Sequence, residues 1–174
     1  MKISKGDDFG WPYTYFDHFK NQRLVAPEYG GDGEKIASEK YKDPIYGLPA
    51  HWAPNDLLFY SGDMFPERYK NGAFIAFHGS TNRSPYPQAG YVVGFIPFKD
   101  GLPSGELEIF ADGFAQVEVI KEMKDAKYRP MGLAEGPDGS LYISDSKKGK
   151  IWRVAYTAEK TSFTDKNLKE MELR

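Results

Sequence analysis

Residues 136–145 read Gly-Pro-Asp-Gly-Ser-Leu-Tyr-Ile-Ser-Asp, which places a tight turn directly before a short apolar run. Proline presets φ for such a turn and glycine supplies a positive φ, so the chain reverses here. Further short apolar runs lie on either side, at 130–134 and 151–154, the second after the Lys-Lys-Gly-Lys turn at 147–150. Three short strands joined by tight turns predict an antiparallel sheet.

A similar unit precedes this one. Four apolar runs that we expect to be strands follow one another at residues 56–62, 73–77, 91–97 and 106–110. In the first unit, Gly-Ala-Phe-Ile-Ala-Phe at 72–77 leads to Gly-Tyr-Val-Val at 90–93. In the second, Gly-Ser-Leu-Tyr-Ile-Ser at 139–144 leads to Gly-Lys-Ile-Trp at 149–152. Repeated four-stranded units of about 40–50 residues are typical of β-propeller blades.

We therefore predict an all-β partial propeller of about two four-stranded antiparallel blades, within one domain spanning 1–174. Its expected parts are a loop-rich segment (1–49), a blade (50–112), a blade that lacks its fourth strand (128–156) and a polar tail (157–174) that forms a short helix or frays. Propeller rings contain about 4–8 blades, so two do not close one. Exposed blade edges invite pairing and predict a homo-oligomer. An unrelated β-meander or sandwich is the alternative.

The composition excludes several classes of protein. A net charge of −2 gives no indication of nucleic-acid binding, and the absence of cysteine excludes disulfides, thiolate metal sites and covalent haem attachment through cysteine. No apolar run reaches the ~18 residues of a transmembrane helix. The N-terminus has no apolar region typical of a signal peptide. The 16% aromatic content agrees with short strands joined by loops.

Few residues belong to a recognisable catalytic or metal-binding pattern. His18, His51 and His78 lack the spacing of a zinc motif. The loop acids do not have the spacing of a calcium-binding EF-hand; they are Asp7, Asp8, Asp32 and Glu34. Hydrolase, phosphate-binding and nicotinamide-binding motifs are absent. We predict no metal site within this chain.

Four ordered motifs resemble those of the glucose/sorbosone dehydrogenase family. They are Asp-Phe-Gly-Trp-Pro at 8–12, Ala-His-Trp-Ala-Pro at 50–54, Ala-Phe-His-Gly-Ser-Thr-Asn-Arg at 76–83, and the stretch from Tyr-Arg-Pro-Met-Gly-Leu-Ala at 128–134 to Ile-Trp-Arg-Val at 151–154. Members are six-bladed propellers that use pyrroloquinoline quinone (PQQ). The resemblance covers about residues 6–156 and implies the C-terminal part of such an enzyme. The general base and the Ca²⁺ ligands would then lie upstream.

The resemblance also implies a set of cofactor-binding residues: Arg129, Lys127, Arg83, Asn82 and His78. PQQ is a planar quinone with three carboxylates, which cationic side chains pair with. Arg129 could instead form a structural salt bridge at the start of its strand, and His78 could cap a strand end. Thr81 departs from the tryptophan of many relatives, so a stacking surface is missing there.

His51 and Trp52 are the predicted substrate-binding residues. Trp52 could stack on a sugar or quinone face, or pack between blades as a structural residue.

The predicted function is the C-terminal portion of a PQQ-dependent sugar (sorbosone or aldose) dehydrogenase, inactive alone. Its partners would be a sugar and an electron acceptor, in the periplasm or outside the cell. The alternative function is a non-catalytic propeller-like binding or self-associating module.

Overall fold

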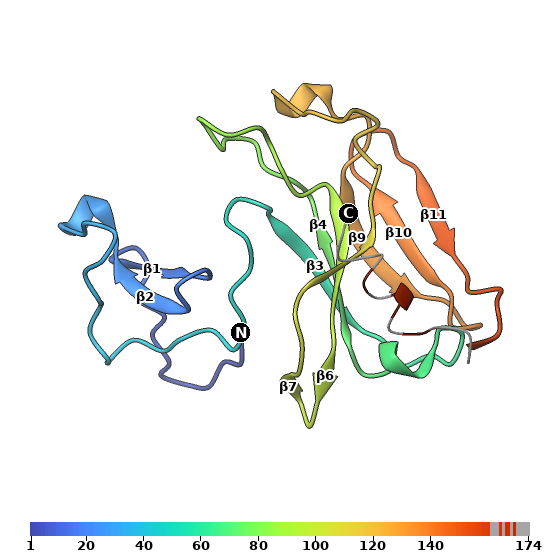
Figure 1. Ribbon diagram of the computed structural model, residues 1–174, viewed down its shortest axis with the longest axis horizontal. Coiled ribbons are helices and arrows are strands. Elements are labelled where there is room, and N and C mark those ends of the chain that lie inside the picture. Colours follow the sequence, from blue (N-terminus) through green and yellow to red (C-terminus); the bar gives the residue numbers. More distant parts are fainter. Residues whose placement is uncertain (161–163, 165, 168, 170–174) are drawn as a thin grey trace. The chain divides into compact units, whose positions relative to one another are not determined.

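The computed structural model describes residues 1–160, 164, 166, 167 and 169. The chain divides into two compact units, residues 1–49 and residues 50–174. The predicted helix or frayed end in the polar tail lies largely outside the described residues. The strands and their order are shown in Figure 1.

The larger unit contains two antiparallel sheets. The four-stranded sheet has the order β3–β4–β5–β8, with bounds β3 Pro54–Phe59, β4 Ala73–Phe77, β5 Val92–Ile96 and β8 Glu108–Ala111. The three-stranded sheet has the order β11–β10–β9, with bounds β9 Pro130–Glu135, β10 Leu141–Asp145 and β11 Ile151–Val154. All seven predicted strands are confirmed, with small shifts at their ends.

Shorter elements connect these strands. A turn at Asp100-Gly101 joins a two-residue pair that was not predicted, β6 (Phe98–Lys99) and β7 (Leu102–Pro103). Single 3-10 turns are η2 (Glu67–Tyr69), between β3 and β4, and η3 (Met123–Asp125), between β8 and β9.

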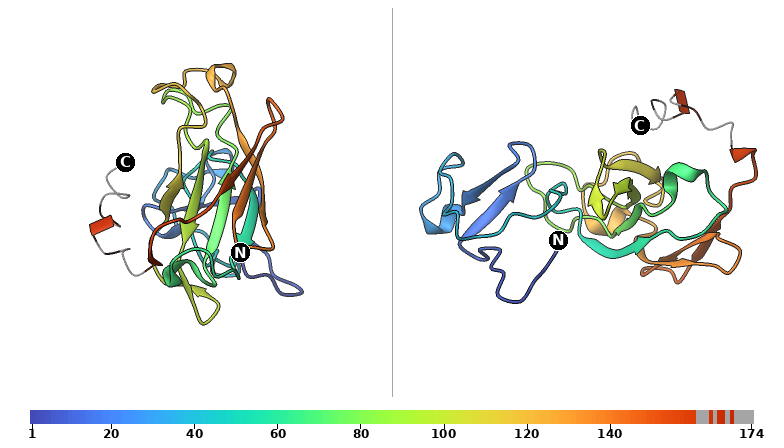
Figure 2. Two further views of the ribbon diagram at one scale, coloured as in Figure 1. Left: turned by 90° about the vertical axis from the view of Figure 1, so that its right-hand side faces the viewer. Right: turned by 90° about the horizontal axis from the view of Figure 1, so that it is seen from below.

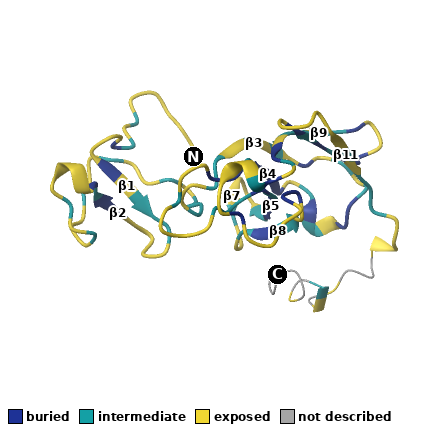
Figure 3. Cartoon of the chain, turned by 90° about the horizontal axis from the view of Figure 1, so that it is seen from above, coloured by how far each residue is buried: buried dark blue, intermediate teal, exposed yellow. Residues whose placement is uncertain are grey.

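The core of the larger unit is rich in aromatic side chains. Phe74 of β4 is fully buried, and its ring centroid lies 5.0 Å from that of Phe95 and 4.6 Å from that of Phe110. Tyr60, Phe65 and Tyr69 pack on the same ring. Figure 3 shows the buried positions gathered on β4 and β5. Aromatic burial of this kind supplies much of the apolar area that stabilises a small β unit.

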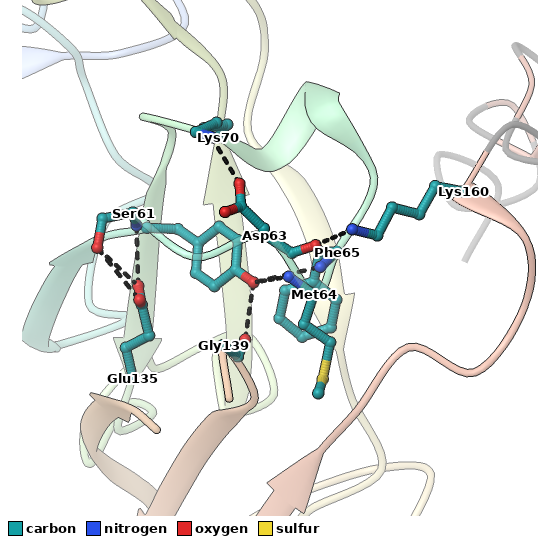
Figure 4. Close-up of polar contacts among 9 residues, drawn as sticks. Ser61, Asp63, Met64, Phe65, Lys70, Glu135, Gly139 and Lys160 are labelled. Atoms are coloured by element: carbon teal, nitrogen blue, oxygen red, sulfur yellow. Dashed lines mark hydrogen bonds and ion pairs between the residues drawn. The ribbon is translucent and has the colours of Figure 1, made fainter. Parts of the chain in front are cut away.

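The two sheets meet where β9 lies beside β3 and β4 (Figure 2). Asp56 on β3 accepts a hydrogen bond from the backbone N–H of Leu133 on β9, with a donor–acceptor distance of 2.7 Å. The phenol of Tyr60 donates to the carbonyl of Gly139 at 2.7 Å and accepts from the backbone N–H groups of Met64 and Phe65 (Figure 4). These bonds fix the register of one sheet against the other.

The smaller unit contains a hairpin of β1 (Thr14–Asp17) and β2 (Gln22–Val25), followed by η1 (Pro27–Tyr29). Arg23 lies near its centre and donates to the carbonyls of Phe9 and Lys42. The sequence had indicated only loops here. Apart from the hairpin and η1 the segment has little regular structure, and its backbone is organised around one buried arginine.

The all-β class and the antiparallel pairing are confirmed. The sheets form no closed barrel, and the prediction that they are propeller blades stays a prediction.

Candidate functional site

One end of the two sheets collects nearly all of the residues singled out in the sequence. Antiparallel strands alternate in direction, so the start of β3, the end of β4, the start of β9 and the end of β10 lie at the same end. The segments involved are residues 51–53, 78–91, 112–129 and 146–150, and Figure 1 shows the last three as loops beyond the strands.

Arg129 links the two sheets at this end. Its side chain is buried, with 7% of the residue's surface exposed. Its Nε donates to the carbonyl of His78 at 2.9 Å, and its Nη2 donates to the carbonyl of Gly79 at 2.7 Å. The guanidinium carbon lies 5.4 Å from the ring centroid of Tyr91. Within the described residues, the side chain therefore binds backbone carbonyls and one aromatic face.

His78 leaves β4 next to this link. Its Nε2 lies 2.7 Å from the hydroxyl oxygen of Ser146, in the turn after β10. Burial lowers the pKa of His78, and the positive charge of Arg129 lowers it further, against a smaller opposite effect of Asp145. The imidazole is therefore neutral at pH 7, when one ring nitrogen can accept a proton or a hydrogen bond.

Asp145 completes the polar cluster and was not predicted as a site residue. One of its carboxylate oxygens accepts from the backbone N–H of Arg129 at 2.6 Å, and the other accepts from that of Lys148 at 2.5 Å. Burial raises the pKa of this carboxyl, but its backbone hydrogen bonds outweigh burial, so the pKa is lowered overall. The sequence signal was an acid at a strand end before a turn, which is common to many sheets.

Asn82 and Arg83 lie on the β4–β5 loop. Asn82 is exposed and Arg83 is half-buried. Nη1 of Arg83 donates to the carbonyl of Pro87 at 3.1 Å, and its guanidinium carbon lies 5.6 Å from the ring centroid of Tyr86. The loop thus presents an amide and a cation at the site end.

His51 and Trp52 precede β3. His51 is exposed and has a positive φ of 64°. The half-buried Trp52 packs edge-to-face on Phe77, with ring centroids 5.3 Å apart. Phe77 lies in β4, in the same sheet as the strand that Trp52 precedes. Packing of Trp52 between blades and binding of a sugar by these two residues therefore both stay predictions.

Lys127 has different neighbours from Arg129. Its ammonium nitrogen lies 5.4 Å from the ring centroid of Tyr128, at the rim of a cavity of about 350 Å³. The cavity is lined by residues of the β8–β9 connection and of β10 and β11, including Lys150 and Trp152. Neither was predicted as a site residue from the sequence, where Lys150 stood in a turn and Trp152 in a strand motif.

The described residues contain no group of three or more His, Cys, Asp or Glu side chains that could hold a metal ion. They also contain no helix long and apolar enough to cross a membrane. His18, in the smaller unit, contacts Phe19, with ring centroids 3.9 Å apart.

The fold and the site end place the chain in the class of proteins built from short antiparallel β-sheets with polar loops gathered at one end. The family model described as TrAA12-like matches residues 14–157, and the chain belongs to this family. An uncharacterised protein of Borreliella burgdorferi is 34% identical over 151 residues, which cover 86% of this chain and 36% of that protein.

Two solved structures of a Trichoderma reesei carbohydrate-active enzyme of family AA12 are also similar. The iodide structure has a TM-score of 0.63 and the calcium structure 0.57, both at 21% identity. Each match covers 84% of this chain and 38% of the enzyme. The chain thus spans little more than a third of the length of the relatives it matches. At this identity the structures establish similarity of fold alone.

The predicted membership of the glucose/sorbosone dehydrogenase family is wrong, because the matching family is TrAA12-like. A tight turn between short apolar runs, as at 136–140, is common in antiparallel sheets of short strands. Such motifs therefore occur in more than one family and do not distinguish between them.

Proposed function

We propose that this chain forms part of a PQQ-dependent carbohydrate oxidoreductase of the AA12 type, and that its sheets are blades of a partial propeller. The family match over residues 14–157 carries this proposal. A carbohydrate-active enzyme has the same fold, which supports it further. We assign the proposed cofactor site to the polar loops at one end of the sheets.

The side chains at this end fit a tricarboxylate quinone in chemical character. Arg83 supplies a cation for a carboxylate, Asn82 supplies an amide, and His78 supplies a neutral imidazole. Arg129 acts as a positioning residue, because it holds the carbonyls of His78 and Gly79 where the cofactor loop begins. When bound, the quinone supplies the electron acceptor for oxidation of a sugar hydroxyl.

The proposal also includes the substrate, the electron acceptor and the location of such an enzyme. Its substrate would be a sugar, a second molecule would reoxidise the cofactor, and the enzyme would work outside the cytoplasm. Ca²⁺ ligands would come from another part of the enzyme.

Titration of the 174-residue chain with PQQ tests this function. We expect saturable quenching of tryptophan fluorescence that weakens about tenfold or more in Arg83→Gln, since one charge-assisted pair is lost. Lys148→Gln, an exposed change in the turn after β10, is the control and is expected to bind as the unmodified chain does. An absence of PQQ binding would contradict the proposal.

Activity measurements test whether the chain alone can oxidise a sugar. With PQQ, Ca²⁺, a sugar and a dye acceptor, we expect little or no turnover by the chain alone. Robust turnover would show that the chain carries a complete active site.

A further inference from the structure

The cavity beside Lys127 has an apolar floor. Trp152 lies at its centre, with ring centroids 5.0 Å from Phe114 and 5.2 Å from Tyr128, both in edge-to-face geometry. The buried Ile143 and the half-buried Val154 complete the floor. A volume of about 350 Å³ lies within the range of small-molecule sites and can accommodate a single sugar ring.

Two lysines stand on the rim of this floor. Their ammonium nitrogens lie 5.4 Å (Lys127) and 5.3 Å (Lys150) from the ring centroid of Tyr128, so they are at most 10.7 Å apart. Lys150 also lies 5.3 Å from the centroid of Trp152. Within the described part of the chain, neither ammonium group forms an ion pair with a carboxylate, although other exposed lysines such as Lys70 do. Two positive charges on the rim of one cavity favour an anionic ligand there.

The rest of the rim is polar but carries less charge. Asp112 and Gln116 line the cavity and are exposed. Two lysines and one aspartate give the rim a net charge of +1, which suits a single carboxylate better than a phosphate dianion. The aspartate and the amide provide acceptors for hydroxyl groups.

The backbone holds the wall of the cavity in place. The N–H of Lys127 donates to the carbonyl of Ala115 at 2.9 Å, and the N–H of Tyr128 donates to that of Phe114 at 3.2 Å. The backbone that carries the lysine, the tyrosine and the phenylalanine is therefore ordered before a ligand binds, which lowers the entropic cost of binding.

We infer that this cavity is a binding site for a uronic acid, a sugar ring that carries one carboxylate. The carboxylate lies between Lys127 and Lys150, and the apolar face of the ring lies on Trp152. The hydroxyl groups face Asp112 and Gln116. The cavity lining includes neither Arg83 nor Asn82, the proposed cofactor contacts, and the inference does not rest on the proposed function.

Titration with sodium glucuronate tests the inference, with the indole N–H resonance of Trp152 followed by NMR and assigned with Trp152→Phe. We expect a saturable shift with glucuronate, and binding of glucose weaker by about tenfold or more, because glucose lacks the carboxylate. Benzoate, which has the charge but no hydroxyl groups, should also bind more weakly than glucuronate.

Substitution of the two lysines is a second test of the proposed site. Lys127→Gln and Lys150→Gln should each weaken glucuronate binding by about tenfold. Lys148→Gln, in the same turn as Lys150 but outside the cavity lining, should leave it unchanged. Thermal unfolding of each variant shows whether the fold is intact, and added salt should weaken glucuronate binding in the unmodified chain.

Three results would overturn the inference. The first is equal binding of glucuronate and glucose, and the second is equal binding of glucuronate and benzoate. The third is competition of PQQ with glucuronate at the Trp152 resonance, which would assign the cavity to the quinone. If Arg83→Gln loses PQQ binding but still binds glucuronate, the PQQ site and the glucuronate site are different sites.

Discussion

The two sheets of the larger unit start from similar sequence patterns but are buried differently. All five residues of β4, the second strand of the four-stranded sheet, are buried. In β10, the second strand of the three-stranded sheet, buried and half-buried residues alternate. The difference arises because aromatic residues from β5, β8 and the β3–β4 connection pack around β4, whereas β10 lies between β9 and the partly exposed edge strand β11. Strand sequence therefore determines pairing, and neighbouring layers determine burial.

The largest expected effect is in the core beneath β4. Phe74→Ala should lower the free energy of unfolding by about 3–5 kcal/mol, because it leaves a cavity among five aromatic rings. Urea denaturation measures the change. Ile151→Ala on β11, where 67% of the residue is exposed, is the matched control and should cost less than about 0.5 kcal/mol. Equal losses would show that the two sheets are buried alike.

The next largest effect is expected where Arg129 connects the two sheets, at the end that carries the candidate site. Arg129→Met should destabilise the chain by about 2–3 kcal/mol, because the carbonyls of His78 and Gly79 each lose a charge-assisted donor. Thermal or urea unfolding tests this. Arg129→Lys keeps the charge but not the forked geometry, and it should recover only part of the loss. A neutral effect of Arg129→Met would show that the arginine does not link the sheets.

At the opposite end of the contact between the two sheets, we expect the hydrogen bonds to contribute less to stability. Tyr60→Phe should cost about 1–2 kcal/mol, since the ring stays packed while the carbonyl of Gly139 and the N–H groups of Met64 and Phe65 lose their partner. The same denaturation assay gives the value. If Tyr60→Phe cost more stability than Arg129→Met, the Tyr60 end of the contact between the sheets would be the stronger one.

The smallest effect is on the titration of His78. Removal of the positive charge in Arg129→Met should raise the pKa of His78 toward its ordinary value, while burial still holds it down. NMR titration of the imidazole measures this. Because the folded-state pKa lies below the unfolded one, the contribution of His78 to stability is complete above about pH 6.5 and falls as the pH decreases. His78→Gln should remove that part of the pH dependence, and an unchanged profile would contradict the assigned shift.

Much of the larger unit was predictable from the sequence. The turn at 136–140 and the apolar runs at 73–77 and 151–154 are local signals, and the structure has strands in these places. The hairpin of the smaller unit was not predictable, because its four-residue strands are held by Arg23 bonding to segments distant in the sequence. The family assignment failed for a related reason, since short strand and turn motifs recur in several families.

The candidate site was predictable only in part. His78 and Arg129 were selected because they lie in motifs that resemble those of the glucose/sorbosone dehydrogenase family, to which the chain does not belong. Ser146 and Asp145 did not stand out, although the structure brings them into contact with these two. The cavity was missed for the same reason, because Lys127 and Lys150 become neighbours only through the ring of Tyr128.

The sequence by itself determined the all-β class, the position of each main strand and the polar character of the loops at one end, because alternation and turn chemistry act over a few residues. Only the tertiary structure decided that Arg129 binds carbonyls of the neighbouring sheet and that Lys127 lines an aromatic cavity. Both outcomes depend on which strand edges and loops come together across long separations in the chain, and no local pattern encodes that arrangement.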